Sequence, residues 1–412
     1  MPLSLVQKLE ILADAAKYDV SCASSGAQKR TARSGEIGSA GQAICHAYTP
    51  DGRCISLLKI LLTNFCIYDC AYCVSRRSSN MARARFSVDE VVRLTLDLYR
   101  RNCIEGLFLS SGIARGEDET MADLVRVAKT LRLEHGYRGY LHLKTIPGAD
   151  ERLIAEAGLY ADRLSMNIEL PSESALKNFA PEKSVTTIKK GLAYTRARID
   201  ETGDGAKAAR PARTKPPRFA PAGQSTQMIV GADGANDMTI LGASAQLYAS
   251  YALKRVYYSA FSPTQHPSAQ LARTATPLIR EHRLYQADWL LRFYGFSLAD
   301  VNAAAPDGML DHTIDPKLAW ALSHRDAFPV DVNTGAREAL LRVPGLGTRS
   351  VDRIIASRRT GALRLADVAR LSAAISRARP FIVTADYHPG RALDAANLRG
   401  RLAPRPEQLS LL

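Results

Sequence analysis

Short apolar runs alternate with stretches in which apolar residues recur at helical spacing, from residue 54 to about residue 260. The apolar runs, which are typical of buried strands, are 54–62, 106–110, 139–144, 163–168, 226–230 and 255–259. The stretches with helical spacing are 88–101, 120–134, 150–157, 172–178, 185–198 and 238–253. Strands alternating with helices predict an α/β fold with a parallel sheet, either a partial barrel or a doubly wound sheet.

The rest of the chain departs from this alternation. Residues 1–18 have the pattern of an amphipathic helix, and the residues that follow, up to 51, are rich in Gly, Ser and Ala and predict irregular structure. Residues 276–294 form a second amphipathic helix, and a compact helical module begins at 330. We expect four regions: an N-terminal extension (1–53), a strand-and-helix domain (54–275) with a basic, proline-rich loop (200–224), connecting helices (276–329) and a C-terminal all-α domain (330–412).

Composition and charge narrow the class of protein. Hydrophobic residues make up 46% of the 412 residues, which is enough for a sizeable core. No apolar run approaches the roughly 20 residues needed to cross a bilayer, and no secretory signal is present, so we expect a cytoplasmic protein without membrane contact. The net charge is +14, and residues 331–412 carry half of it, with 14 Arg, no Lys and 7 Asp+Glu. Because the guanidinium fork matches phosphate geometry, this distribution favours a polyanionic partner.

Three of the seven cysteines lie together as Cys66-x3-Cys70-x2-Cys73, directly after the first predicted strand. In a reducing cytosol such a group indicates metal binding or catalysis rather than disulfides. Three thiolates can hold three irons of a [4Fe–4S] cubane and leave the fourth iron open to a substrate. The alternative is a single zinc ion that shares a distant ligand such as His46, although structural zinc sites usually have a second pair of ligands.

The other cysteines are Cys22, Cys45, Cys54 and Cys103. We expect them to be free thiols, because their spacing is not diagnostic of a metal site. A second, auxiliary cluster held by Cys22, Cys45 and Cys54 is the alternative.

The cysteine spacing resembles that of the radical S-adenosylmethionine (radical SAM) superfamily. Tyr72, an aromatic residue before the last cysteine, stands where that family places a residue near the adenine of the cofactor. The resemblance implies a partial (β/α)6 TIM-like barrel whose first strand ends at the cluster loop, as 54–62 does here. It also implies a [4Fe–4S] cluster that cleaves S-adenosylmethionine reductively and releases a 5′-deoxyadenosyl radical.

The same resemblance assigns further cofactor contacts at strand ends. In the family the second strand runs into a Gly-Gly-Glu-Pro segment, and this chain has Ser110-Ser111-Gly112-Ile113 there, so that backbone carbonyls would replace the missing acid. The carboxyl ends of barrel strands meet on one face, where chemistry collects. The cofactor-binding residues implied are Tyr72, Ser110, Ser111, Gly112, Asn167, Glu169 and Gly231. No catalytic side chain for the reaction on the substrate is assigned.

The C-terminal domain contains a second motif. A short helix at 337–342 leads into Pro344-Gly345-Leu346-Gly347-Thr348-Arg349 and a second helix up to 357, which resembles a helix–hairpin–helix motif. Glycine permits the tight turn, and free N–H groups at a helix N-terminus form an anion site suited to a DNA phosphate. We therefore predict that residues 344–349 bind DNA; the alternative is a helical hairpin used only for packing or dimerisation.

The two motifs together predict radical chemistry on DNA. The arrangement resembles bacterial radical SAM proteins described as DNA modification or repair proteins and linked to a uracil-DNA-glycosylase-like partner. The stretches that carry this resemblance are 17–22, 66–73, 280–289 and the hairpin. An electron donor such as flavodoxin or ferredoxin is a further expected partner. Two alternatives are a radical SAM enzyme that modifies RNA, for example tRNA, and a non-enzymatic iron–sulfur protein that binds DNA or senses its damage.

Overall fold

A computed structural model describes residues 3–17, 43–48, 54–208, 218–264 and 268–403. Contacts divide the chain into two compact units. The first consists of residues 1–235 and 243–276, and the second of residues 236–242 and 277–412.

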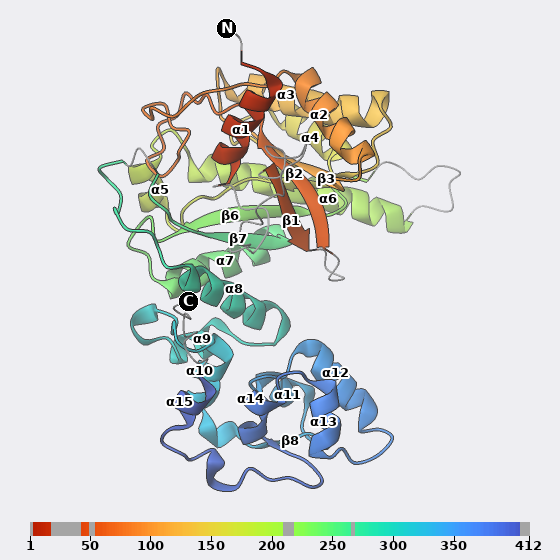
Figure 1. Cartoon of the computed structure of the whole chain (residues 1–412), viewed down its shortest axis with the longest axis vertical. Helices are drawn as coiled ribbons and strands as arrows, with labels where there is room; N and C mark the ends of the chain where they lie inside the picture. The colour runs from red at the N-terminus through yellow and green to blue at the C-terminus, as the bar shows by residue number, and fades with distance from the viewer. Residues whose placement is uncertain (1–2, 18–42, 49–53, 209–217, 265–267, 404–412) are drawn as a thin grey trace, which may run out of the picture. The chain divides into compact units, whose positions relative to one another are not determined.

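A curled seven-stranded sheet forms the centre of the first unit (Figure 1). Its strands follow one another in chain order: β1 Ile44–Tyr48, β2 Cys54–Leu61, β3 Gly106–Ser110, β4 Tyr140–Lys144, β5 Arg163–Ser165, β6 Gln224–Val230 and β7 Arg255–Ala260. The strands β2 to β7 are parallel, and β1 pairs antiparallel with β2. A doubly wound sheet would reverse its strand order at a switch point. The unbroken order therefore confirms the partial TIM-like barrel.

Helices connect the parallel strands, as the sequence predicts. They are α2 Val88–Arg100, α3 Glu117–Lys129, α4 Glu151–Tyr160, α5 Glu173–Phe179, α6 Val185–Ala208 and α7 Asp237–Tyr251. Helix α2 begins with a capping box, in which the Ser87 hydroxyl accepts from the Glu90 amide and the Glu90 carboxylate accepts from the Ser87 amide. The N-terminal helix α1 (Leu5–Ala16) is joined to α2 by an ion pair between Lys8 and Glu90 at 2.8 Å.

Two expectations about this unit were wrong. Residues 44–48 were expected to be irregular but form strand β1, because pairing with β2 gives this short segment an ordered partner. The segment from residue 200 was expected to be a loop, but α6 continues to Ala208. Ion pairs of Arg196 with Asp200 and of Arg198 with Glu201 support this extension at helical spacing. The middle of the predicted loop, residues 209–217, lies outside the described residues.

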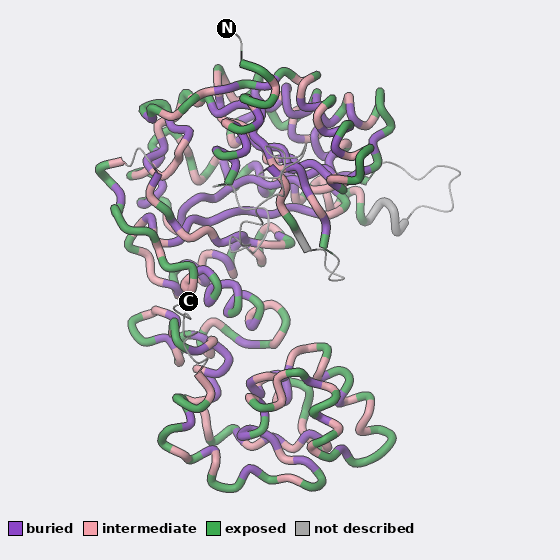
Figure 2. The backbone as a smooth tube through the Cα atoms, in the orientation of Figure 1, coloured by how far each residue is buried: buried purple, intermediate pink, exposed green. Residues whose placement is uncertain are grey.

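Burial of the strands explains why their continuous apolar runs were visible in the sequence. All five residues of β3 and all seven of β6 are buried, so these strands are covered on both faces (Figure 2). Strands buried on both faces read as continuous apolar or small residues rather than as an alternation.

The second unit is mainly helical. Its elements are α8 Leu278–Phe293, α9 Leu298–Ala303, α10 Pro316–Ser323, β8 Val330–Asp331, α11 Arg337–Arg342, α12 Thr348–Ser357, α13 Leu365–Leu371, α14 Ile375–Ala378, β9 Ile382–Val383 and α15 Leu398–Leu402. A single hydrophobic cluster unites Leu290 and Leu318 of the connecting helices with Leu340, Ile354 and Phe381. The helices that precede residue 330 therefore share one core with the hairpin segment. Among the described helices of the chain, none is long and apolar enough to cross a membrane.

Candidate active site

The loop after β2 carries the three cysteines of the motif and is held by one arginine. The guanidinium group of Arg83 donates to four backbone carbonyl oxygens, those of Asn64, Ser75, Arg76 and Ser79. The bonds to the last three measure 2.8, 2.6 and 2.9 Å. A planar guanidinium with five fixed donors can bridge several carbonyls in this way. Arg83 thus ties both ends of the cysteine loop together, a role that the sequence did not reveal.

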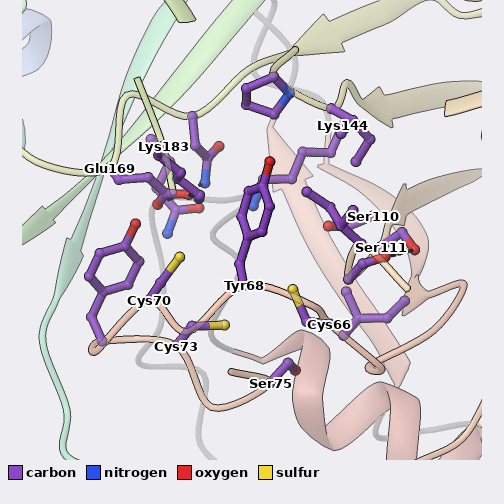
Figure 3. Close-up of a pocket in the computed structure, with 18 of the residues that line it drawn as sticks. Cys66, Tyr68, Cys70, Cys73, Ser75, Ser110, Ser111, Lys144, Glu169 and Lys183 are labelled. Atoms are coloured by element: carbon purple, nitrogen blue, oxygen red, sulfur yellow. Dashed lines mark hydrogen bonds and ion pairs between the residues drawn. The ribbon is translucent and has the colours of Figure 1, made fainter. Parts of the chain in front are cut away.

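The cysteine loop lines a pocket at the carboxyl ends of the strands (Figure 3). The sulfur atoms of Cys66, Cys70 and Cys73 point into a common space. The same pocket is lined by most of the residues predicted to bind the cofactor, namely Tyr72, Ser110, Ser111, Gly112, Asn167 and Glu169. Parallel strands end at one edge of a barrel, so residues that are far apart in sequence meet there.

Gly231 does not line this pocket, although its neighbour Ile229 does. Its φ of +81° is a conformation that favours glycine, and a Cβ there would lie 2.1 Å from Oγ1 of Thr276. The structure therefore gives Gly231 a packing role. At Gly112, in contrast, a Cβ would lie 2.4 Å from the carbonyl oxygen of Phe65 in the cysteine loop, so only glycine permits this approach.

A buried ion pair between Glu169 and Lys183 lies in the wall of the pocket. The Lys183 Nζ lies 2.6 Å from the carboxylate, and the side chains are 14% and 10% exposed for Lys183 and Glu169. The amide of Asn167 donates to the other carboxylate oxygen at 3.4 Å, and the Lys183 ammonium lies 5.8 Å from the centre of the Tyr72 ring. Burial acts to lower the pKa of Lys183, but the Glu169 carboxylate, together with Tyr72 and Cys70, outweighs it and holds that pKa well above its ordinary value. Lys183 is therefore positively charged.

Burial shapes the chemistry of the thiols as well. It raises the pKa of Cys70 to about 11 and that of Cys73 to about 12, while the charge of Lys183 acts in the opposite direction. Thiolates at such positions need a strongly cationic partner, which metal binding provides. The hydroxyl of Tyr72 is buried in the same pocket without a hydrogen-bond partner among the described residues. Three thiols and an unpartnered buried donor fit a cluster with a bound organic ligand.

The two other metal hypotheses gain no support. Within the described residues, no three His, Cys, Asp or Glu side chains are arranged to hold a single metal ion, and His46 does not line the pocket. Cys45 is paired with Leu57 and Cys54 with Tyr48 in the β1–β2 ladder. Because side chains alternate along a strand, Cys45 and Cys54 point to opposite faces of the sheet and cannot share a cluster. Cys22, the third ligand of the auxiliary-cluster alternative, lies outside the described residues.

The structure adds pocket residues that sequence reasoning missed. They include Tyr68, Ser75, Lys144, Lys183 and Gln227. Tyr68 lies between the first two cysteines and donates a short hydrogen bond to Glu117 at the start of α3. Lys144 is the last residue of a predicted strand, so its strand-end position was a usable signal. Lys183 lies in the loop between α5 and α6, where nothing local distinguishes it from a solvated lysine.

Two helices of the second unit, α11 and α12, are joined by a tight turn at the predicted position, and we call this segment the hairpin. Gly345 has a φ of +84°, and a Cβ there would lie 2.6 Å from the carbonyl oxygen of Ala374. Two side chains from outside the hairpin hold the turn: Lys317 Nζ donates to the Leu346 carbonyl at 2.6 Å, and the Tyr294 hydroxyl accepts from the Thr348 amide. The Lys317 ammonium also lies 4.7 Å from the centre of the Tyr294 ring.

The arginines near the hairpin fall into two groups. Arg349, Arg353 and Arg359 are exposed and free to face a polyanion. Arg358 instead donates to the carbonyl oxygens of Val332 and Gly335 at 3.2 and 2.7 Å, so it belongs to the framework of the unit. Pro344 and Leu346 of the predicted DNA-binding stretch are buried in the core.

The parallel barrel and the three-cysteine pocket at its carboxyl edge form a site that fits an iron–sulfur cluster. Residues 60–206, which run from β2 into α6, match the family model of the Radical SAM superfamily. These residues therefore form a radical SAM domain, and the three cysteines of the pocket fit the cofactors of that superfamily, a [4Fe–4S] cluster and S-adenosylmethionine. No curated protein matches the chain.

Solved structures that resemble this chain are distant. The FeFe-hydrogenase maturase HydG from Carboxydothermus hydrogenoformans is 13% identical, with a TM-score of 0.41 over 56% of this chain and 50% of that one. A radical SAM methyltransferase from Sphaerobacter thermophilus is 16% identical, with a TM-score of 0.36 over 59% and 70% of the two chains. The radical SAM methyltransferase TsrM from Kitasatospora setae is 12% identical, with a TM-score of 0.37 over 73% and 60%. The chain thus spans about half the length of the HydG structures it matches.

Proposed function

We propose that this radical SAM enzyme acts on DNA, where it repairs a lesion or installs a modification. The observation that carries the proposal is the hairpin of the second unit, with Arg349 and Arg353 exposed on the first turns of α12. Guanidinium groups beside a helix N-terminus bind phosphates without reading base sequence. A radical SAM domain joined to such a hairpin is suited to chemistry on a nucleic-acid polymer. The resemblance to DNA modification or repair proteins, carried by 17–22, 280–289 and the two motifs, supports the same substrate.

Different residues of the pocket are expected to bind the cluster and to contact S-adenosylmethionine. When bound, the cluster and S-adenosylmethionine supply a 5′-deoxyadenosyl radical, which can take a hydrogen atom from an unactivated carbon. Cys66, Cys70 and Cys73 would hold the cluster. Asn167 and Glu169 present an amide and a carboxylate to the remaining space, and Lys183 fixes the position of that carboxylate.

Two protein partners follow from this function. Low-potential iron–sulfur clusters need a low-potential reductant, so we infer a flavodoxin or ferredoxin as the electron donor. The family resemblance supports a uracil-DNA-glycosylase-like protein as a second partner. A glycosylase and a radical enzyme that share a substrate would both act on DNA bases, which agrees with the proposed function.

Two assays on the full chain test the proposal. The first is anaerobic reconstitution and measurement of 5′-deoxyadenosine with dithionite, comparing wild type with Cys70→Ala. We expect product only from wild type, and its amount should rise when damaged duplex DNA is added. The second is binding of a labelled duplex at several salt concentrations. We expect Arg349→Gln to weaken binding to all duplex sequences and to lower the salt slope by about one, as the loss of one phosphate contact would.

The other outcomes identify the rival functions. Tighter binding of folded tRNA than of duplex DNA at matched salt would transfer the function to RNA. Full cluster content without 5′-deoxyadenosine, whatever DNA is supplied, would leave a protein that binds or senses DNA without catalysis.

A further inference from the structure

A second basic feature lies in the C-terminal part of the second unit, beside helix α14, which packs against the hairpin turn at Gly345. It is a groove of about 490 Å³ lined by residues of α14, of the following turn (Arg379–Phe381), of the segment after β9 and of α15. Its polar side chains include Arg379, Arg401 and Tyr387, and its apolar surface comes from Pro380, Leu398 and Leu402. We call this feature the arginine groove.

The two arginines of the arginine groove differ from their neighbours in the sequence. Arg377 is paired with Asp315, and Arg399 is paired with Asp311. Arg379 and Arg401 are exposed, and neither has a carboxylate partner among the described residues. Two unneutralised guanidinium groups at the rim of one groove attract an anion, and their planar donors suit phosphate oxygens.

Tyr387 prepares one of these arginines and adds an aromatic surface. The Arg379 guanidinium lies 5.0 Å from the centre of the Tyr387 ring, which orients its donors without a charged partner. The ring is half-buried in the wall of the groove, next to the apolar residues. The arginine groove therefore combines a phosphate-binding rim with a surface suited to a sugar or a base.

We propose that the arginine groove binds a nucleotide of single-stranded DNA, with its phosphate on Arg379 and Arg401 and its base against Tyr387 and the apolar wall. This inference rests on the proposed function, since it names the form of DNA that the second unit holds. A paired duplex offers phosphates but keeps its base faces stacked, so it can use the rim alone. An unpaired nucleotide presents both groups, and stacking of its base on an aromatic ring strengthens binding in a sequence-tolerant way.

The test uses the full chain and a fluorescein-labelled oligothymidylate in an anisotropy titration at fixed salt. We expect the double variant Arg379→Gln/Arg401→Gln to weaken the affinity by about tenfold or more. The single variants Arg379→Gln and Arg401→Gln are measured as well. Their matched control is Arg391→Gln, which also removes one charge, from an exposed residue of the same segment that does not line the groove. It should leave the affinity nearly unchanged. The second variant is Tyr387→Leu, which should weaken binding of oligothymidylate about fivefold or more but leave binding of an abasic oligonucleotide of equal length unchanged.

The outcomes separate this inference from the proposed function. If wild type binds duplex DNA through Arg349 while the groove variants bind oligothymidylate like wild type, the inference is overturned and the proposed function stands. If wild type binds neither form of DNA, both fail. Equal competition by an acidic peptide of the same charge would also overturn the inference, because it would reduce the groove to a general polyanion surface. Thermal unfolding curves that match wild type exclude misfolding of the variants as the cause.

Discussion

The ammonium of Lys183 and the carboxylate of Glu169 lie 2.6 Å apart beside the cysteine loop, with most of each side chain removed from solvent. Glu169, which follows β5 by four residues, has a φ of +68°, so the backbone holds it in a left-handed conformation that a non-glycine residue rarely adopts. The ion pair with Lys183 gives this strained residue a fixed partner. The other oxygen of the carboxylate accepts a hydrogen bond from the Asn167 amide.

Removing the ammonium is expected to destabilise the first unit strongly. In Lys183→Met the Glu169 carboxylate remains buried without its partner, which typically costs about 3–5 kcal/mol. Circular dichroism in a urea titration follows both units, whereas tryptophan fluorescence follows the second alone because both tryptophans lie there. A fall of the circular-dichroism midpoint without a fall of the fluorescence midpoint therefore reports on the first unit. The control is Lys129→Met, which breaks an exposed pair with Glu156 and should not shift the midpoint. Equal midpoints for the two variants would show that the buried pair contributes little.

Arg83 is expected to control retention of the cluster. In Arg83→Lys a single ammonium cannot reach the four carbonyl oxygens that the guanidinium bridges, so the cysteine loop loses its closure. Supporting groups around metal ligands typically change metal affinity by 10- to 100-fold. We expect iron to be lost to a chelator about tenfold faster than from wild type, measured by the decay of visible absorbance. Arg93→Lys on the exposed face of α2 is the matched control, and a loss rate equal to that control would contradict the role of Arg83.

The stability of the second unit is expected to rise with pH above neutrality because of Lys317. Burial lowers the pKa of this lysine from 10.5 to about 7, although Asp315 opposes the shift. Between these two pKa values the unfolded chain binds the proton and the folded chain does not, so stability rises as pH increases from about 7 towards 10.5. Below about 7 both states are protonated, and the cost of burying the charge is fully present.

Tryptophan fluorescence measures this effect selectively, since Trp289 and Trp320 both lie in the second unit. Urea midpoints recorded across this pH range should rise for wild type and should be flatter for Lys317→Met. A variant that keeps the wild-type slope would assign the pH dependence to other groups. Lys317→Met also removes the donor to the Leu346 carbonyl, so its duplex affinity should fall as the turn loosens.

The turn of the hairpin is expected to require glycine at position 345. Gly345→Ala places a Cβ 2.6 Å from the Ala374 carbonyl oxygen at a residue with φ +84°, and strain of this kind costs about 1–3 kcal/mol. Gly361→Ala is the control, because a Cβ there meets nothing within 4 Å. The tryptophan unfolding midpoint should fall for the first variant alone. A fall of equal size in both would refute the requirement.

Local features of the sequence determined much of this protein. The six parallel strands, the capping box at Ser87 and Glu90, and the turn at Gly345 were predictable because their signals lie within a few residues of one another. The same is true of Cys66, Cys70 and Cys73, since a cluster loop brings its ligands together by spacing alone. Strand order along the chain was enough to place Ser111, Asn167 and Glu169 at one edge of the barrel.

Tertiary structure decided what depends on contacts between distant segments. Strand β1 forms because it pairs with the edge strand β2. Its five residues are too few for a hydrophobic pattern that would predict a strand. Lys183 meets its carboxylate, Arg83 its four carbonyl oxygens and Lys317 the hairpin turn only after the chain has folded, and these contacts define their roles. A charged side chain has the same sequence signature whether it faces water or a buried partner. Burial and the position of that partner, which the fold sets, therefore decide its chemistry.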